Sequence, residues 1–238
     1  MSWRVGLLIP ASNSVMEVDF YRRFPHDTTL HTSRMYTADA TSADQEQLLT
    51  KLTLPAAEAV GAVLPHIVVF GCTNAASLHG KEYDRELCKR IGEVTGAVPV
   101  SVTASVIQSL CDTRASRIAV VTPYMDNVNR RIRACIEAEG FEVSALHGMG
   151  VPEAETGAVT PEAIYAFVQA SIGPRVPGEA LFLSCTNYQA LGALSLLKIT
   201  YDVPIVTSNL ATLQAVKREL DSLRERDMMH RTHQEASS

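Results

Sequence analysis

The sequence predicts an α/β fold made of two parallel-sheet halves related by a pseudo-two-fold axis, with the active site between them. Short apolar runs alternate with amphipathic helical patterns along the chain, which is typical of parallel strands joined by helices. The tripeptide Cys-Thr-Asn occurs at residues 72–74 and again at 185–187, each time directly after an apolar run. Pro10 and Pro123 are 113 residues apart, and so are Cys72 and Cys185. This shared offset predicts that the two halves have the same plan.

The first series of elements begins with a continuous apolar run closed by Pro10, which is typical of a buried parallel strand. Ser14 and Glu17 have the spacing of a capping box and predict the start of the first helix. Pro55 is expected to kink or divide the long second helix. Up to residue 111, we expect strands at 5–10, 29–36, 67–70 and 98–102, and helices at 15–24, 42–64, 81–94 and 104–111.

The pattern restarts at residue 118 with a second apolar run that ends in proline. Gly140 is expected to end the next helix, and Thr160 and Pro161 to open a later one as N-cap and first residue. We expect strands at 118–123, 143–146, 180–183 and 203–206, and helices at 126–139, 160–172, 188–199 and 208–224. The halves are thus expected at 1–100 and 101–207, with 208–238 packing back on the first and its end, from residue 225, frayed.

Composition and charge restrict the classes of partner. The 238 residues carry a net charge of −5, which offers no basic surface for nucleic acid or an anionic membrane. No apolar run approaches the ~20 residues of a membrane span, and no signal peptide is visible, so a cytoplasmic protein with a small-molecule partner is expected. The five cysteines are an odd number without paired spacing and predict free thiols. No zinc-ligand pattern is present, and we expect neither a metal nor a cofactor.

The two Cys-Thr-Asn sequences are the main candidates for chemistry. In a parallel sheet, ligands gather at the carboxyl ends of the strands, where both Cys72 and Cys185 are placed. A thiol before a helix lies near backbone N–H groups, which lowers its pKa and makes it a base and a nucleophile. Two such thiols on opposite faces of one carbon can act as a pair, one attacking or removing a proton and the other delivering one.

Several polar residues are candidates for binding the substrate, and no cofactor is needed for this chemistry. Hydroxyl, amide and backbone N–H groups can hold a carboxylate or a developing enediolate. On position alone, Asn13 is equally well explained as a residue beside an N-cap and Tyr124 as a turn residue. We interpret Cys88, Cys111 and Cys135 as core or partly buried thiols, since each lies in a helical pattern with apolar neighbours. The predicted substrate-binding residues are Ser12, Asn13, Thr73, Asn74, Tyr124, Thr186 and Asn187.

Four segments together resemble the Asp/Glu racemase superfamily, in particular its branch of maleate cis–trans isomerases and arylmalonate decarboxylases. They are residues 9–17, 71–73, 121–124 and 185–187, and the resemblance covers about residues 4–220. It implies two Rossmann-like halves, usually in a homo-oligomer. It further implies that Asn13 binds a substrate carboxylate, that Cys72 and Cys185 are the two thiols, and that Tyr124 is a carboxylate and proton partner.

The resemblance also ranks the candidate functions of the chain. It implies a cofactor-independent isomerase of a small carboxylate or dicarboxylate, most like maleate isomerase, in which the thiolate of Cys72 adds to the alkene and Cys185 acts as the acid. An amino-acid or hydroxy-acid racemase using the same pair of thiols is the alternative. The decarboxylases keep only the second thiol, so Cys72 argues against that activity. A regulatory protein that binds a small ligand is the non-enzymatic alternative, although binding alone does not require two thiols.

One segment departs from the isomerase pattern. The isomerases carry a further substrate-binding Asn between a strand and a helix of the second half, whereas residues 150–157 contain none. Glu153 or Glu155 near this position would repel a second carboxylate or would pair with an amino group. A substrate other than maleate, such as one resembling an amino acid, therefore stays open.

Overall fold

Two four-stranded parallel sheets form the framework of the computed structural model, which describes residues 2–37 and 42–236. The strand orders are β2-β1-β3-β4 and β6-β5-β7-β8, so the two sheets have the same topology. Their registers also correspond, because Val5 pairs with Ile67 in the first sheet and Ile118 pairs with Ala180 in the second. Each residue of the second pair lies 113 positions after its counterpart in the first pair, which is the offset seen in the sequence. The predicted duplication and the α/β fold are therefore confirmed.

The elements of the first part follow the predicted alternation, with two differences. The long helix predicted over 42–64 is divided by a π-helical turn just before Pro55, since proline has no N–H for the carbonyl four residues earlier. A short helix, α4, follows Cys72 and was not predicted. The elements are β1 (Trp3–Pro10), α1 (Met16–Tyr21), β2 (Thr28–Met35), α2 (Ser42–Gln47), the π-helix η1 (Leu48–Leu52), α3 (Thr53–Gly61), β3 (Ile67–Phe70), α4 (Thr73–Ala76), α5 (Gly80–Thr95) and β4 (Val98–Ser101).

The second part repeats the order, again with one short unpredicted helix, α8, at the residues that depart from the isomerase pattern. The Thr160 hydroxyl caps α9 as predicted, accepting the N–H of Ala163 at 3.2 Å. The elements are α6 (Val102–Asp112), β5 (Arg117–Thr122), α7 (Asp126–Ala138), β6 (Glu142–Gly148), α8 (Glu153–Thr156), α9 (Pro161–Ile172), β7 (Ala180–Leu183), α10 (Ala190–Thr200), β8 (Ile205–Thr207) and α11 (Ser208–Ala236).

The start of α1 differs from the predicted capping box. Val15, not Ser14, occupies the N-cap position and makes no side-chain cap. Asn13 Oδ1 instead accepts the backbone N–H groups of Val15 and Met16, at 3.1 and 3.0 Å. Glu17 pairs with Arg34 of β2 rather than with the backbone. The prediction of a Ser14–Glu17 capping box was therefore wrong, because an upstream amide supplies the cap.

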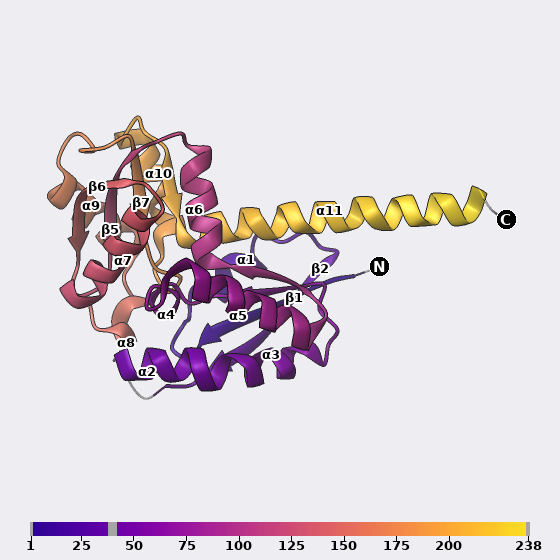
Figure 1. Cartoon of the computed structure of the whole chain (residues 1–238). Coiled ribbons are helices and arrows are strands. Elements are labelled where there is room, and N and C mark those ends of the chain that lie inside the picture. The colour runs from indigo at the N-terminus through magenta and orange to yellow at the C-terminus, as the bar shows by residue number, and fades with distance from the viewer. Residues whose placement is uncertain (1, 38–41, 237–238) are drawn as a thin grey trace.

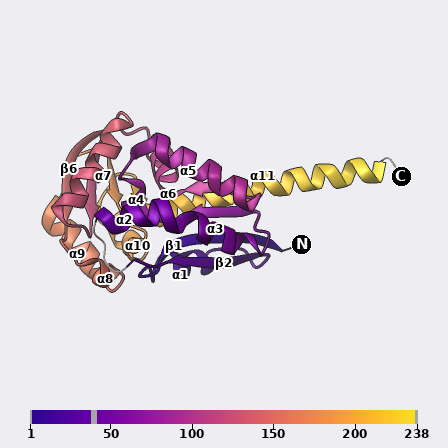
Figure 2. The ribbon, with the colours of Figure 1, turned by 60° about the horizontal axis from the view of Figure 1, so that its bottom comes forward.

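The C-terminal helix α11 is longer than predicted. It continues to Ala236 instead of fraying after residue 224, and the last two residues of the chain lie outside the described part. Residues 225–236 contain neither glycine nor proline and are mostly good helix formers. Leu213, Val216 and Leu220 of α11 are buried in the same cluster as residues of β1 and β3. Figure 1 and Figure 2 both show the far end of α11 extending away from the two sheets.

Candidate active site

A small pocket lies between the halves, at the carboxyl ends of the strands of both sheets. Its volume is about 160 Å³, which suits a molecule of a few heavy atoms. All nine sequence-predicted site residues line it. The lining residues are Pro10, Ser12, Asn13, Gln45, Cys72, Thr73, Asn74, Tyr124, Met125, Asn127, Val128, Val151, Pro152, Glu153, Thr156, Cys185, Thr186 and Asn187.

Cys72 follows β3 and is the N-cap of α4. Its Sγ accepts the backbone N–H of Ala75 at 3.5 Å and donates to Oε1 of Gln45 at 3.7 Å. Burial, together with the charges of Glu153 and Cys185, raises the pKa of the Cys72 thiol to about 12, although the backbone N–H groups of Ala75 and Asn74 lower it. The expected lowering of this pKa by a helix start is therefore wrong, because the two backbone N–H groups do not offset the burial of the thiol.

Cys185 occupies the equivalent position after β7 but has a different backbone. Its φ of 125° lies in a region that non-glycine residues rarely adopt, and such strain costs about 1–3 kcal/mol and is typical of functional sites. The Cys185 thiol accepts the backbone N–H of Asn187 at 3.3 Å. Burial raises its pKa to about 12, opposed by a hydrogen bond from the Tyr124 hydroxyl and by that N–H. Both thiols are therefore protonated at neutral pH.

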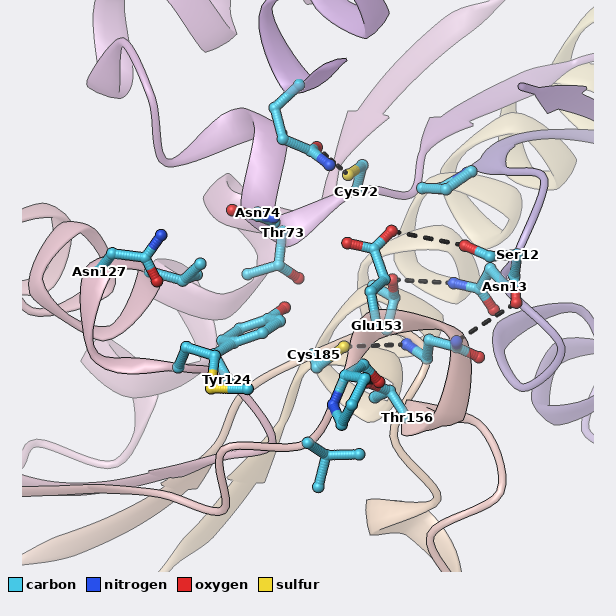
Figure 3. Close-up of a pocket in the computed structure, with 18 residues that line it drawn as sticks. Ser12, Asn13, Cys72, Thr73, Asn74, Tyr124, Asn127, Glu153, Thr156 and Cys185 are labelled. Atoms are coloured by element: carbon cyan, nitrogen blue, oxygen red, sulfur yellow. Dashed lines mark hydrogen bonds between the residues drawn. The ribbon is translucent and has the colours of Figure 1, made fainter. Parts of the chain in front are cut away.

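Tyr124 is held by a set of hydrogen bonds at the end of β5. Its N–H donates to Thr122 Oγ1 at 3.1 Å, and its carbonyl accepts from Asn129 Nδ2 at 3.1 Å. Burial raises the pKa of the Tyr124 phenol well above its ordinary value, so the hydroxyl stays neutral and can donate a hydrogen bond. In Figure 3, Cys72 and Cys185 lie on different sides of the pocket, with the Tyr124 hydroxyl and the Glu153 carboxylate between them.

Three of the predicted substrate-binding residues also join the two halves. Asn13 Nδ2 donates to Thr186 Oγ1 at 3.0 Å, and that hydroxyl donates to the Gly71 carbonyl at 3.0 Å. Asn187 Oδ1 accepts the N–H of Ser14 at 2.9 Å, and Asn187 Nδ2 donates to the carbonyl of Ser12 at 3.3 Å. These side chains fix the width of the pocket by holding the loop after β1 against the loop after β7.

Thr73 and Asn74 leave donors for a ligand on the side of Cys72. Within the described part of the chain, the buried Thr73 hydroxyl has no hydrogen-bond partner. Asn74 Oδ1 accepts from Nη2 of Arg131 at 2.8 Å, across from α7. Because Arg131 occupies the amide oxygen of Asn74, the N–H₂ group of this side chain can donate hydrogen bonds to a ligand.

The structure adds Gln45 and defines the place of Glu153. Gln45 is buried on α2, 27 positions before Cys72, and no local pattern in the sequence connects it with the thiol. Glu153 on α8 enters the pocket, and its Oε1 accepts from Ser12 Oγ at 3.4 Å. Burial raises the pKa of Glu153, opposed by the hydrogen bond from Ser12. Glu155 is exposed and does not line the pocket.

The other cysteines lie outside the pocket. Cys88 and Cys135 are partly buried as predicted, but Cys111 is exposed, so the prediction of a buried thiol was wrong there. Within residues 2–37 and 42–236, no group of three His, Cys, Asp or Glu side chains is arranged to hold a metal ion. None of the helices in that part of the chain has the length and apolar composition needed to cross a bilayer.

Known proteins with the same fold and a matching sequence exist. A profile of the arylmalonate decarboxylase family matches residues 5–231, nearly the whole chain. The chain belongs to this family. It is 25% identical over 238 residues to a maleate isomerase of Pseudomonas putida, with 92% of each chain covered. It is 21% identical over 206 residues to an arylmalonate decarboxylase of Bordetella bronchiseptica, with 86% of this chain and 85% of the relative covered.

Solved structures share the fold. A mutant maleate cis–trans isomerase of Nocardia farcinica, with a covalently bound succinylcysteine intermediate, matches with a TM-score of 0.84. The identity is 21%, over 93% of this chain and 94% of that chain. The predicted two-half fold and the predicted branch of maleate isomerases and arylmalonate decarboxylases are both confirmed.

Proposed function

We propose that this protein is a cofactor-independent cis–trans isomerase of a small unsaturated carboxylate, of the maleate isomerase type. The observation that carries the proposal is the pair of buried thiols, Cys72 and Cys185, on equivalent strand ends around one small pocket. The maleate isomerases among the relatives support it, as does the structural match with a protein that holds a succinylcysteine.

In the proposed reaction, Cys72 adds to one carbon of the cis double bond. The Cys72 thiol first gives its proton to a solvent water molecule, which can return it to the thiolate after product release. The Cys72 sulfur then forms an S–C bond while the electron pair of the double bond moves to the neighbouring carbon. That carbon takes a proton from Cys185, which leaves a single bond that can rotate. Cys185 then removes a proton from the same carbon, the S–C bond breaks, and the trans alkene is released with Cys72 as a thiolate.

The surroundings of the thiols favour this division of roles. Cys185 receives hydrogen bonds from Tyr124 and from the N–H of Asn187, which stabilise it after it has given up its proton. Cys72 has backbone N–H groups and the neutral amide of Gln45 as its partners. The unpartnered hydroxyl of Thr73 and the N–H₂ group of Asn74 supply donors for the substrate carboxylate and for charge that develops next to it.

A racemase of an amino or hydroxy acid is the second candidate. Two thiols on different sides of one carbon can remove a proton from one face and return it to the other. The carboxylate of Glu153 in the pocket favours this alternative, because it would attract the ammonium group of an amino acid.

Proton NMR in heavy water tests both candidates with one panel of substrates. Conversion of maleate or a related cis acid to its trans isomer supports the isomerase, whereas deuterium at Cα with loss of optical rotation supports the racemase. Cys72→Ala and Cys185→Ala should each lower the rate at least 1,000-fold, and Cys111→Ala should not. Retention of the activity by either site variant contradicts the two-thiol mechanism.

A further inference from the structure

The pocket lining contains one acidic side chain and no basic one. Among the lining residues, all of which are described, there is no Lys, Arg or His, and Glu153 is the single carboxylate. Arg131 lies behind Asn74 and meets its amide oxygen, but Arg131 is not part of the lining. A dianionic ligand would therefore enter a pocket without a lining cation.

The Glu153 carboxylate lies close to the reacting groups. Its charge raises the pKa values of Cys72, Cys185 and Tyr124, which shows that its field reaches the whole centre of the pocket. Ser12 Oγ donates to Oε1 of this carboxylate at 3.4 Å. Its remaining lone pairs are acceptors only, since an ionised carboxylate has no proton to donate.

The polar groups on the Cys72 side have the opposite character. Among residues 2–37 and 42–236, the Thr73 hydroxyl has no hydrogen-bond partner, and the Asn74 amide can donate its N–H₂ group because Arg131 occupies its oxygen. Tyr124 is a neutral phenol whose hydroxyl already donates to Cys185, so the free donors on this side are Thr73 and Asn74. The pocket is thus asymmetric, with donors that suit one carboxylate and an acceptor, Glu153, that suits a group bearing N–H.

We propose that Glu153 makes this site select a cis-alkene monocarboxylate whose second polar group is a primary carboxamide, in preference to a dicarboxylate of the same shape. This inference rests on the proposed isomerase function and names its substrate class. A carboxamide has nearly the same shape as a carboxylate but can donate an N–H to Glu153. A second substrate carboxylate at the same place would bring two acceptors with like charges together and would be repelled. A hydrogen bond to a charged group changes affinity by about 10–100-fold.

Binding of unreactive probes tests the selectivity without turnover. Succinate and its monoamide, succinamate, are titrated into the full-length protein, Glu153→Gln and Glu155→Gln by calorimetry at pH 7.5. Glu155→Gln is the matched control, since it removes the same charge from the same short helix outside the pocket. Wild type and Glu155→Gln should bind succinamate about 10–100-fold more tightly than succinate, and Glu153→Gln should reduce this ratio to within about 3-fold.

Three results would overturn the selectivity. They are equal or tighter binding of succinate by wild type, an unchanged ratio in Glu153→Gln, and no binding of either probe. A third probe, 4-aminobutanoate, places an ammonium group where succinamate has its amide nitrogen. Selective binding of that probe in place of succinamate assigns a cationic partner to Glu153 and overturns the carboxamide.

Turnover of maleate and its monoamide in the NMR assay separates this inference from the proposed function. Selective binding of succinamate without isomerisation of either alkene refutes the isomerase and retains the role of Glu153 in selectivity. Faster isomerisation of maleate together with equal binding of the two probes retains the isomerase and refutes the role of Glu153.

Discussion

Alkylation of the two pocket thiols should be slow at neutral pH and should rise with pH far beyond the range of an ordinary cysteine. Burial moves the pKa of both Cys72 and Cys185 from 9.0 to about 12. Each pKa unit is a factor of ten in the ratio of thiolate to thiol, so at pH 7.5 the thiolate fraction is about 1,000-fold lower than that of an ordinary thiol. Below pH 12 the rate should increase tenfold per pH unit, because the thiolate is the reacting form.

The assay is iodoacetamide labelling of the intact native protein between pH 7 and 10, with site-resolved mass spectrometry. Exposed Cys111 is the internal reference and should be modified first. Poor access alone lowers the rate of a buried thiol by the same factor at every pH, so the slope separates access from pKa. A plateau near pH 9 for Cys72 or Cys185 would refute the raised pKa. Glu153→Gln should increase the Cys72 rate, since the Glu153 charge contributes to the raised pKa after burial.

Three further predictions concern the stability of the fold and the support of the pocket. Asn13→Ala should lower the free energy of unfolding by about 2 kcal/mol in urea titrations, because it removes the cap of α1 and a bond between the halves. Burial raises the pKa of Asp84 from 3.8 to about 6, so its stabilising contribution is present below about pH 4 and is lost as pH rises through 6. Asp84→Asn should therefore gain up to about 3 kcal/mol at pH 7.5 and nothing at pH 4, in urea titrations at both pH values. Gly148→Ala should lower kcat with intact circular dichroism, because its methyl group would meet Asn129 Nδ2 and the carbonyl of Tyr124 and displace the phenol.

The fold could be predicted from local sequence patterns. Continuous apolar runs mark strands buried on both faces, and the common offset of Pro10 and Cys72 from their counterparts predicts equal topology. The register of β1 with β3 and of β5 with β7 keeps that offset. The errors concern the two four-residue helices α4 and α8, which were not predicted, and element ends such as the cap of α1 and the end of α11. At these ends, side chains or helix propensity act over a few residues and compete with the apolar pattern.

The residues of the candidate site could be predicted only in part from the sequence. Strand ends of a parallel sheet share one edge, so the placement of Cys72, Cys185 and the residues beside them follows from the order of the elements. Gln45 was not predictable in this way, because it reaches the thiol through the packing of α2 over the pocket. The linking role of Thr186 and Asn187 likewise depends on how closely the two halves approach.

Sequence patterns alone are enough to establish that the chain is duplicated and that two thiols lie at equivalent strand ends. These features depend on local periodicity and on spacing along the chain. The tertiary structure decided the protonation of the thiols and the position of Glu153 in the pocket, with Glu155 outside. The physical reason is that desolvation and charge interactions depend on which groups surround an atom, and most groups around Cys72 come from distant parts of the chain.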